Sequence, residues 1–256
     1  MVTDYVQDMI KKTGALENAI FADEPAIFGL KDIDQGMVVR DYGDLAAKSH
    51  YYVPGFSIMH EEAGRDIAKI NGSDNPASYW NEHYNKPLAR ALAEFVALTG
   101  MTYDSPHSQN FLVELDSNKR PTGKIVLRDF GDTYLNADFF KALGRPDIPK
   151  RWELGNVHKG YLQVTVGILH GNRPPSWMNI SKDKHKSNSY DQWGRDFFTE
   201  YQREFLRQTG VSLSTDYKQP VRNGLYISKK YKTDDNRGKE FLKMVKNGQQ
   251  RAFLMK

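Results

Sequence analysis

The stretch from Gly100 to Asp132 places the strongest restriction on what this 256-residue chain can fold into. Two short apolar runs, FLVEL (Phe111 to Leu115) and KIVL (Lys124 to Leu127), flank SNKRPTG, in which Pro121 and Gly123 are typical turn residues. This pattern predicts a β-hairpin. Because the strands of a hairpin run in opposite directions, residues just before the first strand and just after the second meet at one end.

Six polar side chains are predicted to meet there: His107, Gln109 and Asn110 before the first strand, and Arg128, Asp129 and Asp132 after the second. Strand ends often carry polar residues simply because they meet water, but polar groups on both strand ends favour a nucleotide site. Asp and Asn oxygens suit Mg²⁺, whereas Arg and His side chains suit phosphate oxygens.

These side chains have distinct expected roles in a site for Mg²⁺ and ATP. We expect Asp129 and Asn110 to bind Mg²⁺, and Asp132 to be either a further ligand or the cap of the next helix. Arg128 either pairs with a phosphate or is anchored to a structural carboxylate. His107 either donates to a phosphate or polarises the transferring group, or it packs within its loop.

ATP requires more positive charge than Mg²⁺ and Arg128 supply. Four upstream cations are candidates for its phosphates: Arg40, Lys48, Arg65 and Lys69. Two similar segments, VVRDYGD and VLRDFGD, each place Arg-Asp at the end of a predicted strand. We therefore expect Arg40 or Lys48 to face Asp129 across a cleft. The chain has no Walker-type G-x-x-x-x-G-K-[ST] loop, no glycine-rich kinase loop and no G-x-S-x-G hydrolase elbow.

Composition excludes several other classes of protein and site. The chain has no Cys, which rules out disulfides, thiolate metal sites and cysteine nucleophiles. No run approaches the ~18 apolar residues of a membrane span, and the N-terminus lacks the apolar core of a secretory signal. These features predict a cytoplasmic protein, or an effector delivered without a conventional signal peptide.

The net charge of +4 is concentrated in two segments, Lys182 to Lys186 and Lys218 to Lys256. We favour a solvated basic surface over a nucleic-acid site as the explanation of these segments. ATP, together with an anionic small molecule or a protein as second substrate, would also suit a positive cleft.

Helix signals are clearest between Asn75 and Thr99. Ser73 and Asp74 are candidate caps, and Gly100 is placed to end the helix. Pro87 predicts a kink or two helices. A core stripe is expected at three- and four-residue spacing: Trp80, Tyr84, Leu88, Leu92 and Phe95.

The rest of the chain predicts an α+β fold with an N-terminal layer, an antiparallel hairpin sheet and a helical C-terminal half. Residues 1–30 are interpreted as two short helices, residues 37–40 as a strand, and residues 51–59 as a strand pair or a strand and loop. Helices are expected at residues 135–143, 191–208 and 237–246, and residues 161–169 fit either a strand or a buried helix. We divide the chain into an N-terminal layer, residues 1–75, as a possible nucleotide lid, and a palm-like catalytic part, residues 76–256.

The residues of the predicted site resemble two families that share a kinase-like core. The first is the protein-kinase-like superfamily, in which a metal-binding Asn, a hairpin and Asp-Phe-Gly follow one another, as do Asn110, the hairpin and Asp129-Phe130-Gly131 here. The catalytic Asp of that pattern falls on Ser105, and Asp104 is displaced by one position.

The second is the siderophore synthetase family of the aerobactin-synthetase type, which works without a peptide-synthetase template. Its palm region is similar to residues 50–140 in the order of Trp80 and Tyr84, Gly100, the H-x-Q-N segment and Arg-Asp, and VPGFSIM resembles its apolar segment. This resemblance accounts for Gln109 and Arg128, which the kinase pattern leaves unexplained.

The siderophore synthetase resemblance implies an Mg²⁺- and ATP-dependent enzyme that adenylates a citrate-like carboxylate for capture by an amine or hydroxylamine. It implies nucleotide contacts at His107 and Asn110 and a metal contact near Asp129. Members of that family are more than twice as long as this chain. The alternatives are a kinase-like phosphotransferase, such as a bacterial effector acting on a host protein, and a nucleotide-binding pseudoenzyme whose basic tail docks a partner.

Overall fold

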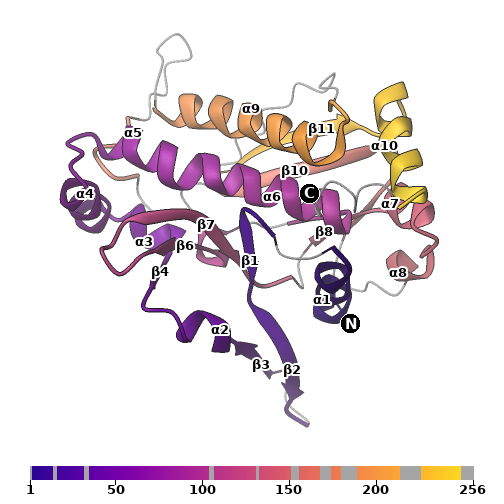
Figure 1. The fold of residues 1–256 in the computed structure, drawn as a ribbon, viewed down its shortest axis with the longest axis horizontal. Coiled ribbons are helices and arrows are strands. Elements are labelled where there is room, and N and C mark those ends of the chain that lie inside the picture. The colour runs from indigo at the N-terminus through magenta and orange to yellow at the C-terminus, as the bar shows by residue number, and fades with distance from the viewer. Residues whose placement is uncertain are drawn as a thin grey trace.

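The predicted α+β class is confirmed by the computed structural model, whose elements are drawn in Figure 1. The structure describes residues 2–13, 16–31, 35–103, 107–130, 133–150, 156–167, 174–179, 189–213 and 226–248. Two long helices, α6 (Lys86–Thr99) and α9 (Ser189–Thr209), lie side by side across one side of the molecule. The sheet that carries the predicted hairpin packs against α6. No described helix is long and apolar enough to span a membrane.

The predicted hairpin is present as β6 (Phe111–Leu115) and β7 (Pro121–Leu127), which pair antiparallel. Two further strands extend it into a sheet of order β1-β7-β6-β4, with β1 (Ala19–Phe21) parallel to β7 and β4 (Tyr51–Pro54) antiparallel to β6. Strands from both sides of residue 75 therefore share one sheet, and the division of the chain at that residue stays a prediction.

The two faces of this sheet are covered by different groups. Phe111, Val113 and Leu115 face the main core, whereas Leu112 lies in a smaller cluster with Val126. Leu45 of a short helix, α2 (Gly43–Ala46), completes that smaller cluster with Ala22. This alternation is expected of a strand that is buried on both sides.

The second helix predicted within residues 1–30 is wrong. Helix α1 (Val2–Thr13) forms, but β1 and β2 (Asp23–Gly29) follow it. Residues 19–21 gain backbone partners from β7 more than 100 positions away, an interaction that local sequence cannot reveal. Pro25 is tolerated because β2 pairs only with β3 (Gly36–Asp41) among the described strands and so lies at an edge. The strand predicted at residues 37–40 is confirmed as β3.

The predicted interruption near Pro87 is confirmed as a change of helix type. The cap of α5 (Pro76–Trp80) is Asn75, which accepts from the Ser78 amide, rather than the expected Ser73 or Asp74. One turn of π-helix spans Asn81–Asn85, and α6 follows. A proline cannot complete the preceding α-helical ladder, and a local π-turn is one way to absorb this. Gly100 ends α6 with φ +69°, and a Cβ there would lie 2.2 Å from the Phe139 ring.

Several smaller elements complete the N-terminal half and the middle of the chain. Residues 51–59 form a strand and a helical turn, β4 and α3 (Gly55–Ile58), before α4 (Glu61–Ile70). The helix expected from residue 135 starts later, as α7 (Ala137–Ala142), because β8 (Thr133–Asn136) pairs with both β5 (Met101–Tyr103) and β9 (Asn156–His158). Helix α8 (Asp147–Lys150) follows α7.

The C-terminal half combines helices with a strand pair. The ambiguous residues 161–169 contain a strand, β10 (Tyr161–Gly167), which pairs antiparallel with β11 (Tyr226–Lys232). The helices expected at residues 191–208 and 237–246 are confirmed as α9 and α10 (Asn236–Lys246). The basic segment at residues 182–186 lies outside the described residues.

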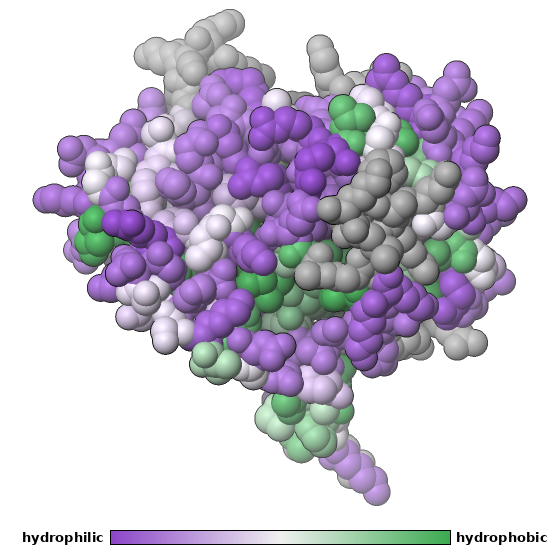
Figure 2. Space-filling view, viewed as in Figure 1, coloured by the Kyte–Doolittle hydropathy of each residue, from purple (hydrophilic) through white to green (hydrophobic). Residues whose placement is uncertain are grey.

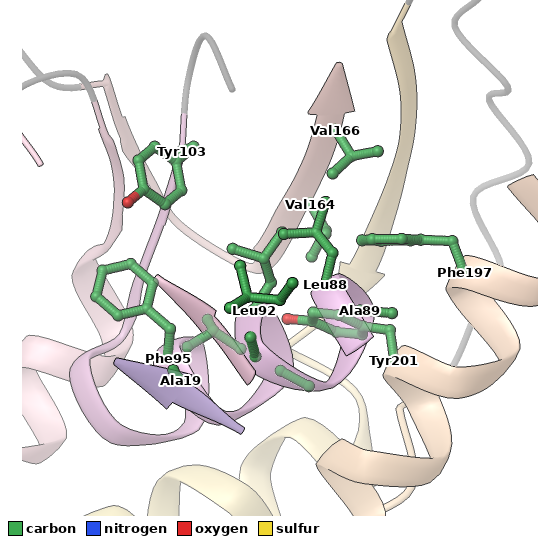
Figure 3. Packing of buried hydrophobic residues seen from close by; sticks show 14 of the residues in the cluster. Ala19, Leu88, Ala89, Leu92, Phe95, Tyr103, Val164, Val166, Phe197 and Tyr201 are labelled. Carbon is green, nitrogen blue, oxygen red and sulfur yellow. The ribbon is translucent and has the colours of Figure 1, made fainter. Parts of the chain in front are cut away.

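Helix α6 is the centre of the core. Figure 3 shows Leu88, Ala89 and Leu92 of α6 between Val164 of β10 and the rings of α9. The predicted core stripe is confirmed, since all five of its residues are at most 5% exposed: Trp80, Tyr84, Leu88, Leu92 and Phe95. The helix therefore fixes the sheet on one side and delivers the chain through Gly100 towards the predicted site.

Candidate functional site

A close contact fixes the H-x-Q-N segment. Ser108–Asn110 form one turn of 3-10 helix directly before β6. Gly55, the first residue of α3, packs against this turn so closely that a Cβ would lie 2.3 Å from Tyr84 Oη and 2.8 Å from the Ser108 carbonyl oxygen. Three segments that carry the family resemblance, at residues 55, 84 and 108, are therefore packed together. Only glycine allows this approach of the two backbones.

Arg128 ties the two ends of the hairpin together. Its Nη2 and Nε donate to the Gln109 carbonyl oxygen at 2.7 and 3.1 Å, and its backbone N–H donates to the Asn110 carbonyl oxygen at 3.2 Å. Its Nη1 lies 3.4 Å from Tyr42 Oη. Among the described residues, no carboxylate pairs with this guanidinium, and its contact with a phosphate stays a prediction. Arg128 instead positions the H-x-Q-N backbone relative to the end of β7.

Asp129 has a left-handed backbone, with φ +66°; Lys119 is the one other non-glycine residue with positive φ in the described part of the chain. The next residue, Phe130, is fully buried among the rings of Phe21, Phe95 and Tyr103. The turn at Asp129 lets the chain deliver Phe130 to the core while the carboxylate stays 44% exposed. A left-handed conformation is unfavourable for most residues, although Asp adopts it more readily than most, so Asp129 stays a candidate site residue.

Arg40 approaches Asp129 from β3. It lies in β3, where its Nε donates to Glu24 Oε1 at 2.8 Å, and its Nη2 lies 4.0 Å from Asp129 Oδ1. The two Arg-Asp segments that resemble each other in sequence therefore meet in space, since Tyr42 of the first also contacts Arg128 of the second. Glu24 was not singled out by the sequence, because nothing near it in the chain indicates a partner.

Tyr103 stabilises the turn at Arg128 and Asp129 through a hydrogen bond. Its hydroxyl donates to the Arg128 carbonyl oxygen at 3.0 Å. Burial raises the pKa of Tyr103 well above its usual value, and the negative charges of Asp129 and Glu24 raise it further. The side chain therefore stays a neutral phenol that can donate this hydrogen bond.

The other three predicted cations lie elsewhere. Lys48 Nζ is 3.5 Å from Glu114 Oε1 on β6. Arg65 pairs with Glu61 at 2.6 Å within α4. Lys69 is exposed on the same helix. Since Lys48 pairs with Glu114 and α4 packs against α5, we leave these three residues out of the proposal below.

Glu114 forms a separate polar cluster on β6. Its side chain is 3% exposed and accepts from Thr122 Oγ1 at 2.7 Å and from Tyr52 Oη at 3.2 Å, while His50 Nδ1 lies 3.1 Å away. Burial favours a raised pKa for Glu114, but the hydrogen bonds from Thr122 and His50 and the Lys48 charge outweigh it and hold the pKa below its usual range. Burial, together with the Glu114 carboxylate, raises the pKa of Tyr52 to about 12.

The predicted metal ligands are only partly described. Asn110 is 6% exposed, and its side-chain amide makes no hydrogen bond to any other part of the chain that the structure describes. Asp132 lies outside the described residues, and within them no three His, Asp or Glu side chains are grouped as metal ligands. Amide and carboxylate oxygens are ligand types that Mg²⁺ accepts, and the binding of Mg²⁺ by Asn110 and Asp129 stays a prediction. His107 is half-buried at the start of the 3-10 turn.

A cavity of about 880 Å³ is lined by residues of α3, the start of α4 and residues 174–176. Phe56, Met59 and Pro175 supply apolar walls, and His60 and Glu61 lie at its polar side. Its size is in the range of small-molecule sites. Glu61 already accepts from the Ser176 hydroxyl and from Arg65, so its charge is compensated.

The chain was compared with known families, curated proteins and solved structures. No family model and no curated protein matches it. Among solved structures, it is similar to aerobactin synthetase IucC from a hypervirulent pathotype of Klebsiella pneumoniae, with 14% sequence identity and a TM-score of 0.41. The match covers 99% of this chain and 41% of that synthetase, so the chain spans less than half of its length. At this distance, the assignment of a function depends on the site itself.

Proposed function

We propose that this chain binds Mg²⁺ and ATP at the end of the β6–β7 hairpin and activates a carboxylate for condensation with an amine or hydroxylamine. The observation that carries the proposal is the approach of Arg40 to Asp129, with the Asp129 backbone held in a left-handed turn. An exposed carboxylate, a buried amide and an opposing guanidinium form a set suited to a metal-bound polyphosphate.

Each side chain has a role that follows from its position. Asp129 and Asn110 would hold Mg²⁺, which supplies neutralisation of the phosphate charge. Arg40 would contact phosphate oxygens from the opposite wall, while Glu24 keeps its guanidinium oriented. His107 would donate to a phosphate oxygen. Arg128 is a positioning residue, since it holds the Gln109 carbonyl rather than the substrate.

The reaction itself comes from the sequence resemblance to siderophore synthetases. In that chemistry a carboxylate oxygen attacks the α-phosphorus and pyrophosphate leaves. The amine nitrogen then attacks the acyl carbon, the acyl–oxygen bond breaks, and AMP leaves. The support for placing this reaction here is that Gly55, Tyr84 and the H-x-Q-N turn, which carry the resemblance, pack beside the proposed site.

The test is to determine which phosphate moves. The chain is incubated with Mg²⁺, citrate, hydroxylamine and ATP labelled at either the α- or the γ-phosphate. Release of AMP and pyrophosphate that depends on citrate supports the proposal. Release of ADP with label on a protein or on citrate would instead support the kinase-like alternative, for which the burial of Phe130 beside Asp129 is the favouring observation. ATP binding without turnover would indicate a pseudoenzyme.

A matched pair of variants assigns the activity to this site. Asp129→Asn removes the charge but keeps a residue type that tolerates a left-handed backbone, and should lower turnover ~10²-fold or more. Lys119→Asn makes the equivalent change at the other left-handed position, in the hairpin turn, and should leave turnover unchanged. His107→Ala should lose about 2–4 kcal/mol of transition-state stabilisation. Normal turnover in Asp129→Asn would refute the site.

A further inference from the structure

Strands β2 and β3 and helix α2 form an arm, residues 23–31 and 35–46, that extends from the body of the protein (Figure 1). In Figure 2 apolar side chains of this region stand out in green at the foot of a mostly purple surface, and Ile27 is 73% exposed. Arg40 belongs to this arm. Its distance from Asp129 therefore depends on how the base of the arm is fastened to the body.

The chain that leaves the arm after α2 meets one carboxylate, that of Glu114 on β6. Three side chains approach its Oε1 atom: Lys48 Nζ at 3.5 Å, His50 Nδ1 at 3.1 Å and Tyr52 Oη at 3.2 Å. Tyr52 is also the partner of Glu114 in the register of β4 and β6. The second oxygen, Oε2, accepts from Thr122 Oγ1 of β7 at 2.7 Å. The hairpin therefore orients one oxygen of Glu114, and the other holds the chain that follows α2.

Tyr52 connects Glu114 to α2 itself. Its hydroxyl oxygen lies 3.2 Å from Glu114 Oε1 and 3.4 Å from the Leu45 carbonyl oxygen. The Leu45 side chain packs in the smaller core cluster, and Tyr42, directly before α2, packs against the same cluster. Tyr42 Oη lies 3.4 Å from Arg128 Nη1. A single short helix thus joins the contacts of Glu114 to residues that meet the candidate site.

A carboxylate is a costly side chain at this position in the strand. Glu114 lies between Val113 and Leu115, which are both buried, and its own side chain is 3% exposed. Burying a carboxylate costs free energy that its hydrogen bonds must offset, whereas an apolar side chain carries no such cost. What an apolar side chain could not do is orient the polar groups of the chain after α2. We therefore look for the role of Glu114 in positioning.

We propose that Glu114 is a positioning residue of the ATP site: it fastens the base of the arm to β6 and thereby holds Arg40 near Asp129. This inference rests on the proposed function, in which Arg40 contacts phosphate oxygens. Glu114 itself contacts neither ATP nor Mg²⁺ in this arrangement, since its oxygens are occupied by Thr122 and by the chain after α2. Its loss should therefore affect how tightly ATP is held rather than the bonds that form and break.

The first experiment measures Mg²⁺-ATP binding by calorimetry, and KM for ATP and turnover in the reaction with citrate and hydroxylamine. Glu114→Leu should weaken binding and raise KM about 10-fold, the lower end of what loss of a charge-assisted contact causes, while turnover at saturating ATP stays within about two-fold. Glu114→Gln keeps an oxygen acceptor and should lose only about three-fold in affinity. Glu200→Leu is the matched control, because Glu200 is a buried carboxylate that pairs with Arg90 between α9 and α6; it should change neither constant. Circular dichroism verifies that each variant is folded.

A double-mutant cycle tests whether the effect of Glu114 passes through Arg40. In an Arg40→Ala background, Glu114→Leu should change the affinity for Mg²⁺-ATP by less than about two-fold, because the contact that it displaces is already absent. An equal loss of affinity in both backgrounds would overturn the proposal, since Glu114 would then act by another route. Unchanged KM in Glu114→Leu, or a loss of turnover with unchanged KM, would overturn it as well.

Amide hydrogen exchange provides a measurement that does not depend on ATP. The Ala46 amide donates to the Tyr42 carbonyl oxygen at 2.7 Å, and the Ala47 amide donates to that of Gly43 at 3.1 Å. In Glu114→Leu these two amides should exchange about 10-fold faster than in the parent chain, while those of α6 keep their protection. Unchanged exchange at both amides would overturn the proposal. A parent chain that binds no Mg²⁺-ATP would refute the proposed function alone, and faster exchange would then still support the fastening of the arm by Glu114.

Discussion

Glu94 provides the most quantitative test of how the sheet is assembled. This α6 residue is fully buried, and its carboxylate accepts three backbone N–H groups, those of Glu17 and Asn18 at 2.8 and 2.9 Å and of Ala19 at 3.0 Å. These amides lead into β1, so the carboxylate holds the strand in place beside β7. Burial raises the pKa of Glu94 in spite of these hydrogen bonds.

The loss of stability in Glu94→Ala depends on which of the three amides are buried when they lose their hydrogen-bond acceptor. Ala19 is buried and Asn18 is half-buried, whereas Glu17 is exposed and can turn to water. Two unsatisfied donors at 1–3 kcal/mol each predict a loss of about 2–6 kcal/mol in the free energy of unfolding. Glu94→Gln keeps one carbonyl oxygen where Oε2 now accepts from Asn18 and Ala19, so its loss should be only about 1 kcal/mol.

The assay is urea denaturation of both variants, together with amide hydrogen exchange. The amides of β1 should exchange faster in Glu94→Ala than in the parent chain, while those of β6 keep their relative protection. Since β1 continues into β2, where Glu24 orients Arg40, ATP binding should weaken in the same variant. Equal stabilities for the Ala and Gln variants, or a loss below about 1 kcal/mol in Ala, would refute this account of β1.

Three further predictions test the site and the sheet. Asp129→Gly and Lys119→Gly should each be as stable as the parent chain, or up to about 1 kcal/mol more stable, in urea denaturation, because glycine accepts a left-handed backbone. Calorimetry should show loss of Mg²⁺-ATP binding only in Asp129→Gly. Gly55→Ala should lower the free energy of unfolding by about 1–3 kcal/mol. Adding Tyr84→Phe should restore part of this loss, because it removes the hydroxyl that the new Cβ meets. A double variant no more stable than Gly55→Ala would contradict the contact between residues 55 and 84. The pKa of Glu114 in the folded protein is below the usual 4.5, so the stability that this carboxylate contributes is complete above pH 4.5 and declines as the pH falls through the lower, folded-state pKa. The stability of Glu114→Gln, followed by thermal melting, should therefore vary less with pH over this acid range. A variant with the same pH profile as the parent chain would count against the cluster.

The candidate site shows which contacts residue types alone can predict and which they cannot. That Arg40 approaches Asp129 was anticipated from the repeated Arg-Asp at two strand ends, and the contact is present at 4.0 Å. The role of Arg128 was not anticipated, because its partner is the backbone carbonyl of Gln109, and a backbone group has no signature in the sequence. Lys48 was grouped with Arg40 because it lies nearby in the chain, yet it pairs with Glu114, a strand residue that looked like part of an apolar run.

The elements that the sequence by itself determined are those whose cause is local. The hairpin at residues 111–127 follows from turn residues between two apolar runs, and the helical stretch from Asn75 to Gly100 follows from a cap, a regular apolar spacing and a left-handed glycine. Both depend on interactions between residues only a few positions apart.

Tertiary structure alone decided what depends on distant partners. Residues 19–21 became a strand rather than a helix because β7 offered free backbone groups and Glu94 bound the amides of residues 17–19. The left-handed turn at Asp129 likewise depends on the pocket of rings that receives Phe130. In each case the energy that selects the conformation comes from groups brought close only by folding, so no window of the sequence contains it.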